Sequence, residues 1–272
     1  VQLLNDRFLK PITMHIIRHV LLMLVLGCCM HNSMAQPTHD PQPQYWRNYH
    51  RVVDYSNQRL TQIPRNIPSD TEVLILDNNN ITRLEHLSNL KQLKVLSIRN
   101  NKISRIQNLN YVEQLEVLYL DGNHITRIEN LNYVENLLVL SISDNHIDRI
   151  QNLNYVENLK ELYLENNNIS RIQNLNYVEE LEVLYLDNNR ITQIENLNYV
   201  EQLMVLSLRS NNITRIQNLN YLEQLRELYL DNNNIKRIEN LRYTKALQLL
   251  SVQDNPISNT HSSVGYSFRL RY

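Results

Sequence analysis

LEVLYLDGNHITRIENLNYVEN, residues 115–136, is one copy of a unit that fills most of the chain. Its apolar positions and one asparagine return every 22 residues, in phase and without an insertion, through nine units. The units start at Thr71, Leu93, Leu115, Leu137, Leu159, Leu181, Leu203, Leu225 and Leu247. A unit of this size cannot bury its apolar side chains alone, so the period predicts a solenoid in which each unit packs on its neighbours.

The first half of the unit predicts a short strand followed by a sharp turn. Leu118 and Leu120 alternate with Tyr119, which is the periodicity of a strand with two inward side chains and one outward. Asn123 follows at the turn, where its amide can satisfy backbone groups that would otherwise be buried without partners. We expect the equivalent residues to form a buried asparagine ladder. Its members are Asn79, Asn101, Asn123, Asn145, Asn167, Asn189, Asn211, Asn233 and Asn255.

The second half of the unit has a different spacing. Ile125, Ile128, Leu131 and Val134 stand three residues apart. This spacing favours turns or short 3-10 segments over a full α-helix.

The complete pattern, LxxLxLxxNxIxxIxxLxxL, resembles that of leucine-rich repeat proteins from about Asp54 to Ile257. Its 22-residue length and Ile-x-x-Ile-x-x-Leu second half are similar to the class that includes the phosphatase-1 regulatory subunit and the bacterial internalins. The resemblance implies an α/β repeat fold: a leucine-rich repeat solenoid curved like a horseshoe, with a parallel β-sheet on the concave face. Turns and short 3-10 segments are then expected on the convex face. Many unrelated binding proteins share this scaffold, so the resemblance does not identify the partner.

Within the first 35 residues, the segment from Met14 to Ala35 has the composition of a secretory signal, and the residues before Met14 lie upstream of it. An apolar run from Val20 to Met30 is followed by Ser33-Met34-Ala35, which places small residues where a signal peptidase reads them. Cleavage would begin the mature chain at Gln36. The apolar run is too short to span a bilayer comfortably. We therefore predict a secreted protein with no membrane span in these residues.

Two other interpretations of this segment stay open. Val25-Leu26-Gly27-Cys28 resembles a bacterial lipoprotein cleavage box, which would leave a lipidated Cys28. Alternatively, the chain is cytosolic and its apolar start is accidental. Both cysteines lie at positions 28 and 29, so the mature chain would have none. The absence of disulfides fits a reducing compartment but does not require one.

Composition argues against nucleic-acid binding and against catalysis. The formal net charge is −1, and removing residues 1–35 takes away three basic residues and one acidic residue, which gives −3. A nucleic-acid-binding chain would show a clustered Lys/Arg face. Three glycines cannot supply a phosphate-cradling loop, and no Ser/His/Asp set stands apart from the repeat. We predict a non-enzymatic protein that needs no cofactor.

The segments outside the repeats complete the predicted organisation. We divide the chain into 1–35 with the signal, a linker at 36–50 that holds Trp46, an amino-terminal cap at 51–70, nine repeats at 71–257, and a partial carboxy-terminal cap or truncated tail at 258–272. The string from Val52 to Pro64 is similar to the cap of extracellular leucine-rich repeat proteins, but Tyr55 stands where that family usually has a cysteine. Tyr266–Leu270 alternates and predicts one more edge strand. With no Met at residue 1 and an abrupt end, we expect a fragment.

The outward strand positions form the predicted concave face, with rungs about 4.8 Å apart. Its three columns contain tyrosines and seven acids against two arginines. Tyrosine supplies a large rigid contact area at low entropic cost, so we interpret this face as a binding site for a protein or peptide with a basic surface. The predicted contact residues are Tyr119, Tyr163, Tyr185, Tyr229, Arg99, Asp121, Glu161, Glu165, Asp187, Arg209 and Asp231. The alternative is that the tyrosines are good strand formers that only stabilise their cross-strand neighbours.

Three further columns run outside the concave face. We interpret the arginine and glutamate columns as solvated faces that keep the rod soluble. We expect the outer tyrosine column to be a structural ladder of rings stacked along the convex side. The arginine column is Arg83, Arg105, Arg127, Arg149, Arg171, Arg215 and Arg237; the glutamate column is Glu113, Glu135, Glu157, Glu179, Glu201 and Glu223; the outer tyrosine column is Tyr111, Tyr133, Tyr155, Tyr177, Tyr199, Tyr221 and Tyr243.

Two smaller features complete the candidate sites. Asn80, Asn168 and Asn212 each begin an Asn-x-Ser/Thr sequon beside a ladder asparagine, and we predict glycosylation there. His124 and His146 occupy equivalent positions on adjacent units. Two histidines fall short of the three or four ligands of a metal site, so we predict no metal.

These observations favour a secreted leucine-rich repeat glycoprotein that binds a protein partner on its concave face. The resemblance to extracellular members implies adhesion, matrix or immune recognition. The alternative is an intracellular regulatory subunit of the phosphatase-1-binding type, which the resemblance also implies would dock its partner on the concave face.

Overall fold

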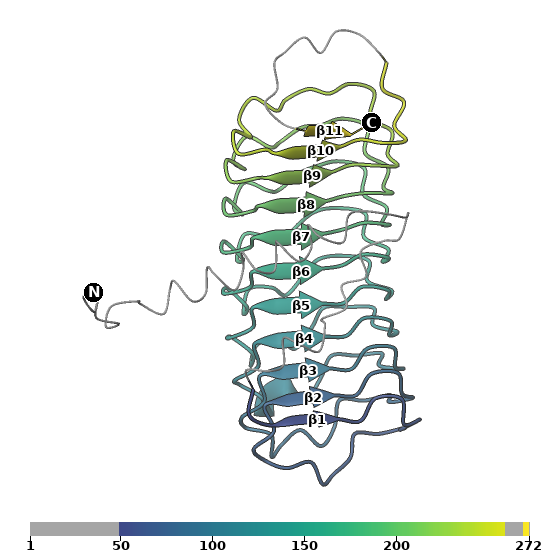
Figure 1. The fold of residues 1–272 in the computed structure, drawn as a ribbon, viewed down its shortest axis with the longest axis vertical. Coiled ribbons are helices and arrows are strands. Elements are labelled where there is room, and N and C mark those ends of the chain that lie inside the picture. The colour runs from purple at the N-terminus through teal and green to yellow at the C-terminus, as the bar shows by residue number, and fades with distance from the viewer. Residues whose placement is uncertain (1–48, 259–268, 272) are drawn as a thin grey trace, which may run out of the picture. The chain divides into compact units, whose positions relative to one another are not determined.

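The computed structural model describes residues 49–258 and the strand at 269–271. Eleven three-residue strands form one parallel sheet, and their order in the sheet follows the chain (Figure 1). They are β1 (Val52–Asp54), β2 (Val73–Ile75), β3 (Val95–Ser97), β4 (Val117–Tyr119), β5 (Val139–Ser141), β6 (Glu161–Tyr163), β7 (Val183–Tyr185), β8 (Val205–Ser207), β9 (Glu227–Tyr229), β10 (Leu249–Ser251) and β11 (Arg269–Arg271). The predicted leucine-rich repeat solenoid is confirmed, with one strand in each unit.

The core runs as one continuous cluster through the stacked units. The middle residue of each strand from β2 to β10 is a leucine with no exposed surface, as at Leu118 in β4. The second half of the same unit adds Ile125 and Ile128, which are also fully buried. Full burial of such a side chain contributes roughly 1.5–3 kcal/mol relative to leaving it exposed. Each unit therefore supplies a similar share of stability, and the core grows with the number of units.

Turns replace helices between the strands. Residues 49–258 contain no α-helix and a single 3-10 helix, η2 (Leu109–Tyr111). This outcome confirms the expectation from the three-residue spacing. It has a local cause, because Asn108 immediately before η2 has a φ of 59°, and an asparagine in this left-handed conformation interrupts any helical run.

The same left-handed asparagine occurs in seven consecutive units and forms a second ladder, which we did not predict from the sequence. In each case the side-chain Nδ2 donates to a carbonyl oxygen 24 residues earlier, as Asn130 does to Ile106 at 2.6 Å. His86 takes the equivalent place in the first unit, with its Nδ1 2.8 Å from the Ile63 carbonyl. These turn asparagines are Asn108, Asn130, Asn152, Asn174, Asn196, Asn218 and Asn240.

The asparagine ladder is confirmed. From Asn79 to Asn233 its members are 3–8% exposed, and Asn255 in the last unit is partly exposed. Asn145 shows the pattern: its Oδ1 accepts from the backbone N–H of Ile125 at 2.8 Å, and its Nδ2 donates to the Leu120 carbonyl at 3.0 Å. Both groups belong to the preceding unit. Further bonds from Nδ2 reach carbonyls two and three residues back, so each ladder asparagine joins two adjacent units.

The described ends of the rod continue the same construction. In the segment predicted as the amino-terminal cap, β1 pairs with β2, and Ile63 and Ile67 are buried. Asn79 connects this segment to the ladder, since its Nδ2 donates to the Tyr55 carbonyl at 2.9 Å. At the other end β11 pairs with β10, and its residues Arg269–Arg271 overlap the predicted strand Tyr266–Leu270 at positions 269 and 270.

Several expectations fall outside the described residues. They are the signal from Met14 to Ala35, Trp46, and positions 266–268 of the predicted last strand. The boundaries assigned to the linker and the two caps stay predictions. No helix among the described residues is long and apolar enough to cross a membrane.

Candidate functional site

The three outward columns lie side by side because the strands pair in register. Tyr119 on β4 is the partner of Ser97 on β3 and of Ser141 on β5. The first and third residues of each strand and the residue two positions after it supply the columns. All eleven residues predicted as contacts belong to them, so the structure brings the whole predicted set onto one face.

Every aspartate of the concave face is held by a serine of the next unit. The serine stands 20 residues later in the chain, and its hydroxyl donates to the aspartate Oδ1. The bonds are Ser97 to Asp77 at 2.7 Å, Ser141 to Asp121 at 2.5 Å, Ser207 to Asp187 at 2.5 Å and Ser251 to Asp231 at 2.6 Å. The same oxygen also accepts a backbone N–H of the next unit, as at Arg209, at 2.8 Å. Each carboxylate is thus oriented by two donors.

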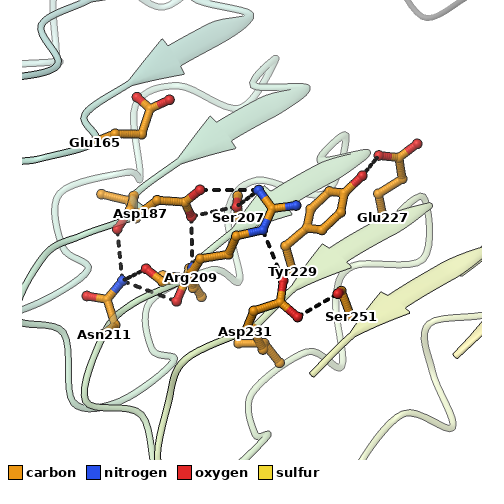
Figure 2. Close-up of polar contacts among 12 residues, drawn as sticks. Glu165, Asp187, Ser207, Arg209, Asn211, Glu227, Tyr229, Asp231 and Ser251 are labelled. Carbon is orange, nitrogen blue, oxygen red and sulfur yellow. Dashed lines mark hydrogen bonds and ion pairs between the residues drawn. The ribbon is translucent and has the colours of Figure 1, made fainter. Parts of the chain in front are cut away.

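Arg209 connects two of these aspartates, as Figure 2 shows. Its Nη1 lies 3.3 Å from Asp187 Oδ2 and its Nε 3.0 Å from Asp231 Oδ2. The guanidinium carbon lies 3.9 Å from the ring centroid of Tyr229, within cation–π range. The arrangement places one cation between carboxylates of the two neighbouring units.

An equivalent arrangement occurs five units earlier. Arg99 Nε lies 3.0 Å from Asp121 Oδ2, and its guanidinium carbon lies 4.1 Å from the ring centroid of Tyr119. The aspartates, serines, arginine and tyrosine of this module all recur 110 residues later. The concave face therefore carries two copies of one arginine-centred module.

Some tyrosines of this face contact its acids directly. The hydroxyl of Tyr163 donates to Glu161 at 2.7 Å and that of Tyr229 to Glu227 at 2.5 Å. Tyr163 is 8% exposed and Tyr229 is 5% exposed, and burial raises the pKa of both phenols. These contacts support the alternative that the tyrosines stabilise their neighbours on the sheet. Their part in binding stays a prediction.

The electrostatics of the face are dominated by carboxylates. Seven acids against two arginines leave an excess of five negative charges in the three columns. Burial raises the pKa of Asp77, Asp121 and Asp187, although the hydrogen bonds they accept and the nearby arginines oppose the rise. Because these carboxylates are buried, their charged forms are poorly solvated. A cation brought to this face would stabilise them.

We did not predict from the sequence that the serines orient the aspartates of this face. A signal for them was present, because each aspartate of the third column is followed 20 residues later by serine, as in Asp187 and Ser207, and each arginine by tyrosine, as in Arg209 and Tyr229. Such a fixed offset between two columns indicates side chains that pair across adjacent strands.

The arginine column is exposed and makes ion pairs. Where the next unit offers a glutamate 24 residues later the two side chains pair, at 2.9–3.1 Å between Nε and Oε1. The pairs are Arg105–Glu129, Arg171–Glu195 and Arg215–Glu239. The arginine column is thus exposed, as predicted, and it also forms ion pairs between adjacent units. Each exposed ion pair contributes little to the free energy of unfolding.

The predicted stacking of the outer tyrosine column is wrong. Its rings are 36–54% exposed, and across residues 49–258 no ring contact joins two of them. The reason is local. Tyr133, for example, precedes the fully buried Val134, so that Val134 enters the core and the tyrosine ring points to solvent.

The remaining candidates are placed as follows. Asn212 is exposed, and Asn80 and Asn168 are partly exposed. The rings of His124 and His146 stack, with centroids 6.0 Å apart and an interplanar angle of 4°. In the described part of the chain no group of three His, Cys, Asp or Glu side chains is arranged to hold a metal ion.

Comparisons with known proteins agree with this architecture. A family model described as "Leucine Rich repeats (2 copies)" matches residues 72–111 and 157–199, and one described as "Leucine rich repeat" matches 179–235. A search of curated protein sequences finds no match.

Solved structures with the same fold include two internalins of Listeria monocytogenes. Internalin C2 is 28% identical, with a TM-score of 0.63, and the match covers 71% of this chain and 86% of that one. The functional domain of InlJ, which includes a cysteine ladder, is 20% identical, with a TM-score of 0.57 and coverage of 75% and 53%. TLR13, solved in complex with ssRNA13, is 22% identical, with a TM-score of 0.61 and coverage of 69% and 30%.

This chain therefore spans about half of the InlJ domain and less than a third of the TLR13 chain. Scaffolds of this kind expose a continuous sheet face on which proteins bind, and they are typically not enzymes. The in-phase units, the single parallel sheet and the family matches together show that the chain belongs to the leucine-rich repeat proteins.

Proposed function

We propose that this chain is a secreted, non-enzymatic scaffold that binds a protein with a basic surface on its concave face, in adhesion, matrix or immune recognition. The observation that carries the proposal is the excess of carboxylates on that face, held in fixed orientations by serine hydroxyls and backbone N–H groups. Carboxylates that are already oriented lose little conformational freedom when a partner binds. Lysine or arginine side chains of the partner would offset the negative excess.

The sign of the charge also supports a protein partner over a nucleic acid. Phosphate groups would be repelled by the seven acids of the three columns, and the two arginines there already pair with aspartates, as Arg209 does with Asp187 and Asp231. Nucleic-acid binding needs an excess of free basic side chains. We therefore assign the face to a basic protein or peptide and to no nucleic acid.

A set of paired variants tests the face. The concave variant changes Tyr119, Tyr163, Tyr185 and Tyr229 to Ser. The outer control variant changes Tyr111 and Tyr243 to Ser, since the rings of both already contact a cation of the chain. Partners captured by the wild-type chain are compared with those of each variant by quantitative mass spectrometry, after circular dichroism has confirmed folding. We expect a partner that the outer variant keeps and the concave variant loses. A folded concave variant that keeps full affinity for every partner would contradict the assignment.

A milder variant separates charge from packing. Glu161→Gln, Glu165→Gln and Glu227→Gln keep the shape of the side chains and leave an oxygen to accept the hydroxyls of Tyr163 and Tyr229. The neutral variant should bind the captured partner more slowly and with a weaker dependence on salt, because electrostatic attraction mainly raises the association rate. Identical rates for the two chains would show that the partner is not selected by charge.

Secretion rests on the signal pattern from Met14 to Ala35 and on three sequons with at least partly exposed asparagines. Expression in secretory cells should give a product that starts at Gln36 and shifts on glycosidase treatment. Replacement of Asn80, Asn168 and Asn212 by Gln should abolish the shift. An uncleaved, unglycosylated cytosolic product would contradict secretion.

Such a product would favour the second candidate, an intracellular regulatory subunit of the phosphatase-1-binding type. The absence of cysteine after position 29 is compatible with that compartment. Binding of purified phosphatase-1 catalytic subunit to the wild-type chain, lost in the concave variant, would support this second function.

A further inference from the structure

The outer tyrosine column is an array of exposed aromatic rings. Its seven members are among only eight large apolar or aromatic side chains that are exposed in the described residues, the eighth being Val52. They recur once per unit, so the rings form a row along the rod. Stacking within the fold does not account for this row, since no ring contact joins its members within residues 49–258.

The glutamate column runs beside these rings. In each unit the glutamate follows the tyrosine by two residues, and the residue between them is buried, as in Tyr133, Val134 and Glu135. Both flanking side chains are therefore exposed together. None of the six glutamates forms an ion pair with another described residue, whereas Glu129, Glu195 and Glu239 on the arginine side do. The row is thus acidic as well as aromatic.

The two end rings of the column bind cationic side chains of the chain itself. At one end of the column, Lys91 Nζ lies 5.3 Å from the ring centroid of Tyr111. At the other end, the guanidinium carbon of Arg242 lies 4.4 Å from the ring centroid of Tyr243. Both distances are within cation–π range. Between these ends, Tyr133, Tyr155, Tyr177, Tyr199 and Tyr221 have no such cation among the described residues.

We propose that these five inner rings and the glutamate column form a second binding site, separate from the concave face, for an extended Lys/Arg-rich segment of a partner protein. Five neighbouring strands of the sheet, at about 4.8 Å each, span roughly 19 Å, which about six residues of extended chain cover at ~3.3 Å each. An eight-residue segment is therefore long enough to follow the units that carry these rings. Cations of the segment lie over the rings and pair with the glutamates. The glutamates beside the rings would repel a phosphate group, so the site does not fit a phosphate-bearing ligand.

The test uses the full chain and a fluorescent eight-residue peptide that alternates arginine and alanine. Because the concave face also attracts cations, binding is measured by anisotropy in the Glu161→Gln, Glu165→Gln, Glu227→Gln background as well as in wild type. In the neutral concave background, changing Tyr133, Tyr155, Tyr177 and Tyr199 to Ser should weaken binding at least tenfold, or about 1.4 kcal/mol. In wild type the loss should be smaller, because the acidic concave face still attracts the peptide. Glu135→Gln, Glu157→Gln, Glu179→Gln and Glu201→Gln should also weaken it while leaving the rings in place.

The same peptide with citrulline for arginine is the matched control, and it should not bind. Unchanged affinity after the tyrosine substitutions in the neutral concave background would overturn the proposal, whatever the outcome at the concave face. Equal binding of the citrulline peptide, or loss with the tyrosine but not the glutamate variants, would also overturn it and indicate a neutral ligand. Urea unfolding of each variant checks that the substitutions leave the fold intact.

Discussion

The asparagine ladder and the outer tyrosine column repeat with the same period, yet they serve opposite purposes. From Asn79 to Asn233 the ladder residues are 3–8% exposed and connect adjacent units, whereas the outer tyrosines are 36–54% exposed and contact no ring of their own column. A residue that recurs unchanged in every repeat therefore does not necessarily stabilise the fold. The number of backbone groups that a residue satisfies separates a column that holds the fold from one that is available to a partner.

Asn145→Ala should produce the largest loss of stability. It removes the acceptor for the Ile125 N–H and a donor to the Leu120 and Ile142 carbonyls, inside the stack. A buried donor left without a partner, together with the lost bonds, should cost about 3 kcal/mol. Urea denaturation followed by circular dichroism measures the effect. Tyr155→Ala in the same unit is the control, and equal losses for both would erase the distinction between the two columns.

Asn152 tests the second ladder and should give a smaller effect. Asn152→Ala loses the 2.7 Å bond to the Ile128 carbonyl and forces alanine to a φ of 57°, for an expected cost of about 2 kcal/mol. Asn152→Gly loses only the bond, because glycine adopts this conformation readily, so it should cost about half as much. A glycine variant no more stable than the alanine variant would show that backbone conformation is not the reason for asparagine here.

The two ladders also show how far sequence could lead. The buried position of Asn123 was predictable, because an amide after a strand offers the donors and acceptor that a tight turn needs. The role of Asn130 was not, since neither its left-handed φ of 58° nor its bond to Ile106 is visible in the period. On the concave face, the repeat predicted which residues form the three columns, but it did not directly predict the hydrogen bonds between them. Predicting the Asp187–Ser207 bond requires comparison of two columns, because the serine stands in a different column, 20 residues after the aspartate.

Asp77→Asn should change the pH dependence of stability. Burial raises the pKa of Asp77 above its ordinary value of 3.8, so the folded chain binds this proton more readily than the unfolded chain. Ionisation therefore opposes folding above the raised pKa, and this penalty is absent below 3.8. Relative to wild type, the variant should gain stability as the pH rises from 3.8 through the raised value, then level off.

Urea midpoints of both chains between acid and neutral pH measure this difference. Ser97→Ala removes a hydroxyl that lowers the pKa of Asp77, and it should increase the penalty relative to wild type. A stability difference between the Asp77→Asn and wild-type chains that does not vary with pH would show that the carboxylate is not held as described.

The smallest effect is expected at the outer tyrosines. Tyr155 is 48% exposed and bonds no backbone group of the described residues, so Tyr155→Ser should change the free energy of unfolding by no more than about 0.5 kcal/mol. Urea denaturation of this single variant measures it. A loss as large as that of Asn152→Ala would mean that the outer tyrosine column is structural after all.

Hydroxyl-radical footprinting of the folded chain tests the central distinction most directly, because mass spectrometry reports the oxidation rate of every tyrosine in one experiment. The structure predicts fast oxidation of Tyr133, Tyr155, Tyr177, Tyr199 and Tyr221, which are 48–54% exposed, and rates several-fold slower at Tyr163 and Tyr229, which are 8% and 5% exposed. Equal rates for the two groups, or protection of the outer tyrosine column, would contradict the account.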